Sequence, residues 1–449
     1  MVKNLFKNIL FRNENNIAQK KLQNNEINEK WFRLDNAAKL YPVIMKRSYV
    51  SVFRISAIMN ENIDPDILQD SLDFIITRFP YYNVKLRKGF FWYYFEKNKN
   101  RLLVEPDVKN PCKTMNRKEN NGFLIRIRYY KKRIAVEFFH GLTDASGTLI
   151  FLETLIARYL FFKEKIVIPA QNGVLDCLSK PSIEEFEDSY NKYANFKVIR
   201  RARQENSYKI KGTDEPIHTL HIITGIVPLS ELKTITKRYG VSITEYLASV
   251  FIYSIYMHQQ SIKNRDSEKP IQISVPVNMR NHYPSKTMRN FSLFVSPGIE
   301  PAYGTYTFEE ILEHVHHYMR YELSSKYMNA LMCANVSSEK NVLIKAVPLF
   351  IKNIGMLLGY QKFGILKYSA TLSNLGIVIV PDEMKKQVGR FDLVIGPCKY
   401  NPINIGLVSY NDKINITFSS TIVEKDIERM FFRHLVKSGI PVKIETNEE

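Results

Sequence analysis

The stretch FFHGLTDASG, residues 138–147, decides how the rest of this chain is interpreted. An apolar, β-rich run ends at His140, a tight segment follows, and a helix is expected to start within a few residues. A histidine at a strand end projects into a cleft, and its ordinary pKa of ~6.5 suits a general base near neutral pH. Asp144 is placed to orient the turn by ion pairing or to cap the helix. Gly147 lets backbones approach closely.

The His-x-x-x-Asp spacing alone leaves a second interpretation open. The chain has 9 histidines and 45 acidic residues, so such a pair can arise by chance. In that case His140 is an ordinary buried or loop histidine, and Asp144 is only the N-cap of the next helix.

Other segments of the chain favour the functional interpretation. Together with residues 138–147, they resemble acyltransferases of the chloramphenicol-acetyltransferase-like fold, which carry an HxxxD active-site motif. That superfamily includes alcohol acetyltransferases, plant BAHD acyltransferases, polyketide-associated acyltransferases and the condensation domains of nonribosomal peptide synthetases. The matching segments are RLDNAA at 33–38 with YP at 41–42, VPVNMR at 275–280 with MRNF at 288–291, and TLSNLG at 371–376. The resemblance covers about 31–440.

The resemblance implies an α/β fold of two similar sandwich domains with mixed sheets and an active-site tunnel between them. His140 would deprotonate an acceptor alcohol or amine, which then attacks an acyl thioester without a covalent acyl-enzyme. Asp144 would point away from substrate and pair with an arginine, for which Arg280 is the candidate. Ser373 or Asn374 would donate to the oxyanion, although they are also explained by a turn before a strand at 376.

Departures from the motif narrow the assignment. Condensation domains typically read His-His-x-x-x-Asp-Gly, whereas Phe139 and Ala145 occupy the first and last of these positions here. The resemblance therefore argues against a peptide synthetase domain, and residues 391–396 only faintly resemble the Asp-Phe-Gly-Trp-Gly segment of the plant enzymes. A catalytically silent protein that binds a carrier protein or acyl ligand stays open as the alternative function.

Composition limits the class of protein and the cellular compartment to which the sequence can belong. Hydrophobic residues make up 45% of the chain and charged residues 24%, which excludes a wholly disordered or fibrous protein. The net charge of +19 favours anionic partners such as phosphorylated cosubstrates. Four scattered cysteines form no CxxC pair, which favours a reducing, cytoplasmic setting. No membrane span is expected, because no apolar run approaches the ~18–20 residues needed to span a bilayer.

The chain divides into four expected regions. Residues 1–30 read as a mobile basic extension, 31–200 as an N-terminal domain with the HxxxD motif, 201–215 as a linker and 216–449 as a C-terminal domain. Within 1–12, apolar residues at helical spacing alternate with basic ones. Such a helix either packs on the body or makes peripheral contact with an anionic membrane.

Secondary structure is expected to mix strands and helices in both halves, without a strict βαβ rhythm. The expected strands are 49–59, 84–95, 101–105, 124–130, 133–139, 218–227, 271–276, 376–380, 391–395, 403–409 and 414–419. The expected helices are 64–78, 146–162, 230–239, 243–256, 307–324 and 424–437.

The expected partners follow from the resemblance and from what the sequence lacks. The donor is expected to be acyl-CoA as a cosubstrate, with a separate acyl carrier protein as the alternative, and no permanently bound cofactor. No metal site is expected, because the His314–His317 pair lacks further ligands. No nucleic-acid-binding module accompanies the basic runs. The superfamily resemblance favours a monomer.

Overall fold

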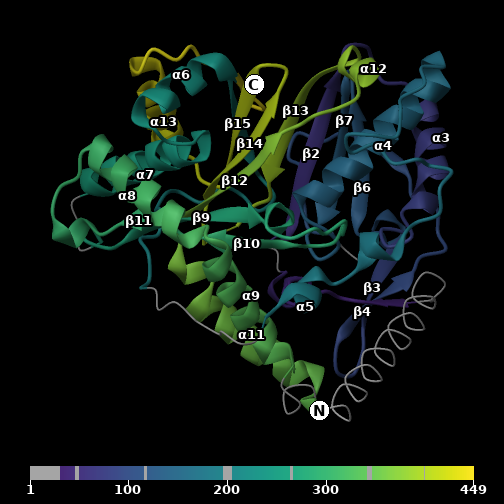
Figure 1. The fold of residues 1–449 in the computed structure, drawn as a ribbon, viewed down its shortest axis with the longest axis horizontal. Coiled ribbons are helices and arrows are strands. Elements are labelled where there is room, and N and C mark those ends of the chain that lie inside the picture. The colour runs from purple at the N-terminus through teal and green to yellow at the C-terminus, as the bar shows by residue number, and fades with distance from the viewer. Residues whose placement is uncertain are drawn as a thin grey trace, which may run out of the picture.

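The computed structural model describes residues 31–45, 50–115, 119–195, 205–262, 266–340, 346–398 and 400–448. The expected extension at 1–30 and residues 201–204 of the expected linker lie outside this range. Within it the chain forms two lobes that lie side by side, each with a sheet toward the centre and helices outside (Figure 1).

The N-terminal lobe contains a five-stranded sheet in the order β13–β2–β7–β6–β5. In that order the strands are Val388–Ile395, Val52–Met59, Arg133–Phe139, Ile125–Tyr130 and Val104–Pro106. Helices α3 (Pro65–Ile75) and α4 (Ala145–Glu164) pack on each other, and α4 also packs on β2 and β7. A small sheet, β1–β4–β3, lies beside them with strands Trp31–Arg33, Tyr93–Lys97 and Val84–Lys88.

The C-terminal lobe is built on an eight-stranded mixed sheet. Its strands run β10–β9–β12–β14–β15–β8–β16, namely Ser292–Val295, Ile271–Asn278, Ala370–Ile377, Ile403–Tyr410, Lys413–Ser420, His221–Pro228 and Lys443–Thr446, with β11 (Gly298–Ile299) beside β9. The helices on its outer face in Figure 1 are α6 (Leu229–Tyr239), α7 (Ile243–Ser261), α8 (Phe308–Glu322) and α13 (Asp426–Lys437).

Two long helices, three short helices and several 3₁₀ turns connect these layers. The helices are α2 (Tyr41–Ile44), α5 (Ser189–Tyr193), α9 (Ser325–Lys340), α11 (Leu349–Phe363) and α12 (Asp382–Lys385). The 3₁₀ turns are η1 (Ile76–Arg78), η2 (Asn120–Gly122), η3 (Ile183–Phe186), η4 (Met279–Asn281), η5 (Pro301–Tyr303) and η6 (Ile365–Lys367).

One strand ties the two lobes together. β13 comes from the second half of the chain but pairs antiparallel with β2, so Phe391 lies opposite Ala57. β13 also packs on β14 of the other sheet, where Gly406 lies so close to the Leu393 carbonyl that a side chain at 406 would overlap it. β14 therefore contributes to both hydrophobic cores: Val408 and Tyr410 belong to the core of the N-terminal lobe, and Ile405 and Leu407 to that of the C-terminal lobe.

Most sequence-based expectations for the elements are confirmed, and the errors have local causes. The hairpin of β6 and β7, the helix after His140, and strands β8, β9, β13, β14 and β15 all form near the expected positions. The expected strand at 84–95 is two strands, β3 and β4, because the chain turns at Gly89 to Trp92. The expected strand at 376–380 is wrong: β12 runs from 370 to 377, with its irregularity at Gly376, where φ is +85°. Helices α9 and α11 were not expected.

Helix α4 corrects the expectation that no apolar run approaches the length needed to span a bilayer. Among the described residues, α4 alone is long and apolar enough to cross a membrane by length and composition. Most of that window, 61%, is buried inside the N-terminal lobe, against α3 and the sheet. This burial is typical of the core helix of a globular domain.

Candidate active site

His140 is the first residue after β7, and its backbone is fixed by the neighbouring strand. Its N–H donates to the Ser51 carbonyl oxygen at 2.8 Å. The half-buried imidazole stacks on the Tyr41 ring, with centroids 4.6 Å apart and planes 14° apart, and Phe53 lies against it at 5.0 Å. Aromatic contacts from two different elements, α2 and β2, therefore hold the imidazole in place.

A polar chain sets which nitrogen of His140 carries the proton. The Asn290 amide nitrogen donates to Asp35 Oδ2 at 3.3 Å, because an ionised carboxylate only accepts. The Asn290 Oδ1 must then face His140 Nδ1, 3.0 Å away, so Nδ1 carries the hydrogen. This arrangement leaves the Nε2 lone pair as the free basic site.

Burial controls the protonation of His140 and Asp35, the two titratable residues of this hydrogen-bonded series. Desolvation lowers the pKa of His140 from its ordinary value of 6.5, so the imidazole is neutral at pH 7 and able to accept a proton. Burial raises the pKa of Asp35 to about 6, against the opposing effect of the Arg289 guanidinium. Asp35 is thus ionised at pH 7 but gains a proton as the pH falls through 6.

Asp144 lies in the loop after His140, but its side chain bonds the first turn of α4 and residues of the other lobe. It is the N-cap of α4, where Oδ1 accepts from the Gly147 N–H at 3.3 Å. Its Oδ2 accepts from Arg280 Nη1 at 2.8 Å and from the Phe291 N–H at 2.9 Å. The pairing with Arg280, expected from the resemblance, is therefore present, and it crosses from one lobe to the other.

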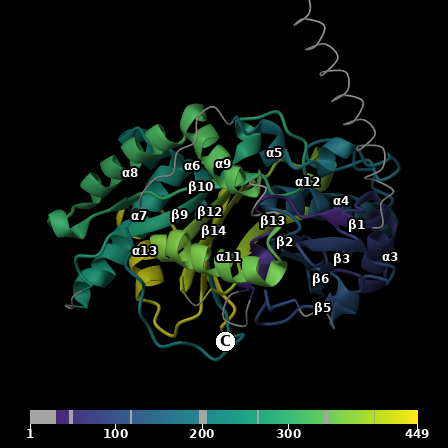
Figure 2. The same cartoon turned by 90° about the horizontal axis from the view of Figure 1, so that it is seen from below.

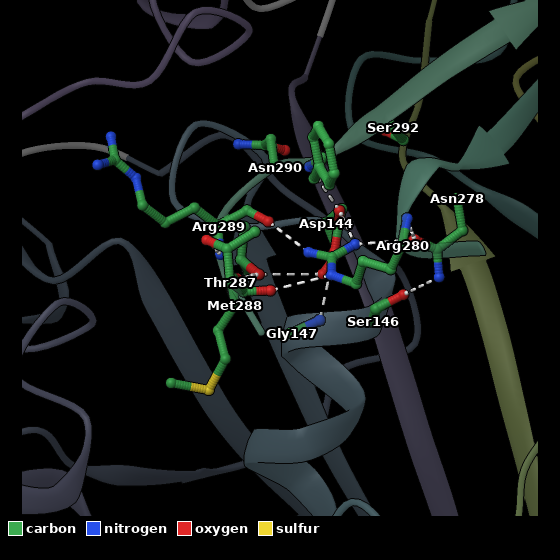
Figure 3. A network of polar contacts seen from close by, with 12 residues as sticks. Asp144, Ser146, Gly147, Asn278, Arg280, Thr287, Met288, Arg289, Asn290 and Ser292 are labelled. Carbon is green, nitrogen blue, oxygen red and sulfur yellow. Dashed lines mark hydrogen bonds and ion pairs between the residues drawn. The ribbon is translucent and has the colours of Figure 1, made fainter. Parts of the chain in front are cut away.

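Arg280, on η4, organises the strand end opposite Asp144 (Figure 3). Its Nε donates to the Thr287 carbonyl at 2.9 Å and its Nη2 to the Arg289 carbonyl at 2.6 Å. Its side chain is only 14% exposed. One guanidinium thus binds Asp144 on one lobe and, on the other, the segment that carries Asn290 to His140.

Gly147 lies where the first turn of α4 meets this segment. A Cβ at this position would overlap the Met288 carbonyl oxygen, the Thr143 hydroxyl and the Tyr82 hydroxyl. The first of these is backbone, and both hydroxyls bond to it, so none of the three can move independently. Gly147 is therefore required for the close approach of the two lobes.

We expect Gly147→Ala to lower the free energy of unfolding by about 1–3 kcal/mol, the usual effect of overpacking a filled interior. Chemical denaturation measures this value. The matched control is Gly359→Ala, because a Cβ there meets no atom within 4 Å. Equal stability of the two variants would contradict the close approach at Gly147.

Ser373 and Asn374 lie within β12, not in a turn as one sequence-based interpretation held. The Asn374 amide nitrogen donates to Thr244 Oγ1 at 2.8 Å, and its Oδ1 accepts from the Gly376 N–H at 2.8 Å. Asn374 is therefore occupied in joining β12 to α7. Among the described hydrogen bonds, neither Ser373 nor Asn374 contacts His140 directly.

Sequence reasoning missed the residues that orient the imidazole. Asp35, Tyr41 and Asn290 all lie in segments quoted for the resemblance, yet no local pattern assigns any of them a role at His140. Three separate segments meet at His140, and pairing between residues 35, 140 and 290 is invisible in one sequence. A short buried polar residue in an apolar context, as in RNF at 289–291, was the available signal.

The surface pockets do not outline the expected tunnel. One pocket, lined by Lys131, Arg390 and Lys443 among others, lies at the end of β7 remote from His140, and a second lies beside β12 and Tyr410. Neither is lined by His140, whose ring is covered by Tyr41 and Phe53. The tunnel remains a prediction. In the described part of the chain no group of three or more His, Cys, Asp or Glu residues could hold a metal ion.

Comparison with known proteins shows which solved structures have a similar fold. No family model and no curated protein matches the chain by sequence. Polyketide synthase associated protein 5 from Mycobacterium tuberculosis matches the structure with a TM-score of 0.60 and 12% identity, over 90% of this chain and 97% of that one. Trichothecene 15-O-acetyltransferase from Fusarium sporotrichioides matches with a TM-score of 0.57 and 13% identity, over 90% and 93%.

A third match is a variant of the starter condensation domain of rhizomide synthetase, solved in complex with C8-CoA. Its TM-score is 0.56 and its identity 11%, over 90% of this chain and 94% of that domain. At such identities the likeness concerns the fold alone. The chain has the two-domain, mixed α/β fold of chloramphenicol-acetyltransferase-like acyltransferases and condensation domains.

Proposed function

We propose that the protein is an acyltransferase that moves an acyl group from a thioester to an alcohol or amine. The observation that carries the proposal is the state of His140 within this fold: a neutral imidazole whose Nδ1–H is held by Asn290, which leaves Nε2 basic. Such a group is suited to general base catalysis. Acetyltransferases and condensation domains of the same fold support transfer of an acyl group.

The proposed reaction balances without a covalent enzyme intermediate. His140 Nε2 takes the proton of the acceptor O–H or N–H as the oxygen or nitrogen attacks the thioester carbonyl. The tetrahedral oxyanion collapses, the C–S bond breaks, and His140 returns the proton to the thiolate. The products are an ester or amide and a free thiol. Ser373 or Asn374 is the proposed oxyanion donor: Ser373 offers a hydroxyl, and the bond to Thr244 takes only one of the two N–H groups of the Asn374 amide.

Asp144 and Arg280 act as positioning residues in this proposal. Their ion pair fixes both sides of the interface that brings Asn290 to His140. The proposed donor is acyl-CoA, supported by the neighbour bound to C8-CoA, with an acyl carrier protein as the alternative donor. We also propose a cytoplasmic location, with which four free cysteines agree.

The test is an acyl-transfer assay on the full chain. Acetyl-CoA and longer acyl-CoAs are incubated with a panel of alcohols and amines, while thiol release and product mass are followed. We expect acceptor-dependent thiol release that persists at pH 6.5 and declines only at lower pH, because burial lowers the pKa of His140 below its ordinary value and the imidazole gains its proton late. Loss of the acceptor dependence, or no release with either CoA or carrier-protein donors, would contradict the proposal.

Asn290→Leu should reduce kcat by up to about 10²-fold, the size of effect that a small misplacement of a reacting group produces. The leucine cannot hold the Nδ1–H tautomer, so a smaller fraction of His140 presents a basic Nε2. The matched control is Asn404→Leu, which removes a similarly buried amide that bonds the Asn401 carbonyl in β14. If both variants lose the same fraction of kcat, Asn290 has no specific role.

A further inference from the structure

Helix α11 turns apolar side chains toward solvent. Phe350, Ile351, Ile354 and Leu358 are 61%, 48%, 61% and 60% exposed. At 3.6 residues per turn these four positions fall on one face of the helix. The result is a continuous apolar stripe, whereas isolated exposed apolar residues would need no explanation.

The opposite face of α11 carries a charge. Lys352 is only 6% exposed, and its Nζ donates to the Phe91 carbonyl at 3.2 Å and lies 3.8 Å from the centre of the Trp92 ring. A helix on the surface of a water-soluble domain normally has the reverse arrangement, with charge outside and hydrocarbon inside. Leu349 is also buried on this inward side, so α11 is apolar on both faces. Its outward face is therefore suited to contact with an apolar medium.

The turn between β3 and β4 extends the stripe. Phe90 and Phe91 there are 72% and 44% exposed, and the Leu349 N–H donates to the Phe90 carbonyl at 2.9 Å. The two views agree that α11 lies along one side of the molecule, toward the viewer in Figure 2. We call this surface the apolar ridge; its residues are Phe90, Phe91, Phe350, Ile351, Ile354 and Leu358.

The surroundings of the apolar ridge are basic. Residues 84–95 and 346–368 contain five lysines and one arginine but no acidic residue. Lys85 and Arg87 among them pair with Glu96 of β4. Exposed Lys88 and Lys362 lie in the two elements that form the ridge. Protruding aromatic and aliphatic side chains flanked by cations are typical of proteins that bind the interface of an anionic membrane.

The apolar ridge also lies near the proposed active site. Helix α11 packs on α2, and Tyr41 of α2 stacks on His140. The ridge is thus connected to the imidazole through two packed helices, α11 and α2.

We propose that the apolar ridge docks the protein on an anionic lipid surface, with Phe90 and the exposed face of α11 inserted among the acyl chains. Resting on the proposed function, this position would allow a lipophilic acceptor or acyl chain to reach His140 from the bilayer. Convex elements, a helix face and a turn, form the ridge, and the flanking cations match anionic headgroups. These features favour a lipid surface over a second copy of this chain.

The test is flotation of the full chain with phosphatidylcholine vesicles that contain or lack phosphatidylglycerol. We expect binding to the anionic vesicles that weakens with salt. The variant Phe90→Ser/Ile354→Ser/Leu358→Ser should bind the vesicles at least about tenfold more weakly, because it lacks three large apolar side chains that would be buried in the bilayer. The matched control, Val167→Ser/Leu178→Ser/Ile217→Ser, removes residues 69%, 80% and 66% exposed outside the ridge and should bind like the wild type.

A spectroscopic readout places the contact. The chain has two tryptophans, Trp31 and Trp92, so a Trp31→Phe background leaves Trp92, beside the ridge, as the reporter. Lipids with brominated acyl chains should quench Trp92 only when the ridge is intact. The variant Lys3→Glu/Lys7→Glu/Arg12→Glu changes the basic residues within 1–12, the alternative membrane contact. It should show the same quenching of Trp92.

Three outcomes would overturn the proposal: no vesicle binding, equal binding by the ridge variant, or a dimer in sedimentation that only the ridge variant loses. His140→Ala should bind vesicles like the wild type. A protein that binds vesicles but transfers no acyl group would therefore contradict the proposed function and leave the docking surface supported.

Discussion

Replacing His140 with alanine is expected to lower kcat for acyl transfer by about 10²- to 10⁴-fold, the usual contribution of a positioned general base. The imidazole is neutral because burial lowers its pKa, and Asn290 leaves Nε2 as the basic nitrogen. Alanine supplies no base, so an acceptor hydroxyl with an ordinary high pKa would attack unassisted. Steady-state kinetics with a saturating thioester donor measures the loss.

The folded state should change little in this variant. The side chain is half-buried, and its truncation is expected to lower the free energy of unfolding by about 1 kcal/mol, typical of a point substitution. His317→Ala is the matched control, because His317 is 72% exposed on α8 and far along the chain from the motif. A kcat unchanged in His140→Ala would contradict the role of His140 as the base. No turnover in the wild type either would favour the catalytically silent protein that binds a carrier or acyl ligand.

Local sequence features predict much of the frame around His140. The nearly continuous apolar run of β7, the turn and the capping Asp144 are all encoded within residues 133–147, and the strand-to-helix geometry follows from them. The resemblance to the superfamily then supplied the partner of Asp144, since Arg280 is 136 positions away and no local pattern connects them.

Long-range features account for what sequence reasoning missed. The chain of Asp35, Asn290 and His140 joins three segments, and the pairing of β13 with β2 joins strands more than 300 residues apart. Neither leaves a periodic signal. Helix α11 was missed for another reason: its sequence, LFIKNIGMLLGYQKF, is apolar on most sides and contains two glycines, so it shows little helical periodicity.

Asp144→Ala is expected to lower the free energy of unfolding by about 3–5 kcal/mol, because it leaves the guanidinium of Arg280 buried without its carboxylate partner. The substitution also removes the acceptor for the Phe291 N–H and the cap of α4. kcat should fall as well, since the loop that carries His140 loses its anchor on the other lobe. Denaturant titration and kinetics measure the two effects separately.

Asp64→Ala is the control that separates capping from cross-lobe pairing. Asp64 caps α3 through the N–H groups of Asp66 and Ile67, both on its own helix. Its loss should therefore remove only about 0.5–2 kcal/mol, the value of an N-cap. If Asp144→Ala is no more destabilising than Asp64→Ala, the ion pair with Arg280 contributes nothing beyond the cap.

A double-mutant cycle with Arg280→Ala completes the argument. Arg280 loses bonds to the Thr287 and Arg289 carbonyls as well as to Asp144, so its single substitution should also be strongly destabilising. If the pair acts as one cross-lobe connection, the double variant will be less destabilised than the sum of the single variants, because no uncompensated charge remains buried. Strict additivity would mean that the two residues stabilise their lobes independently, and Asp144 would then have no positioning role for Asn290 and His140.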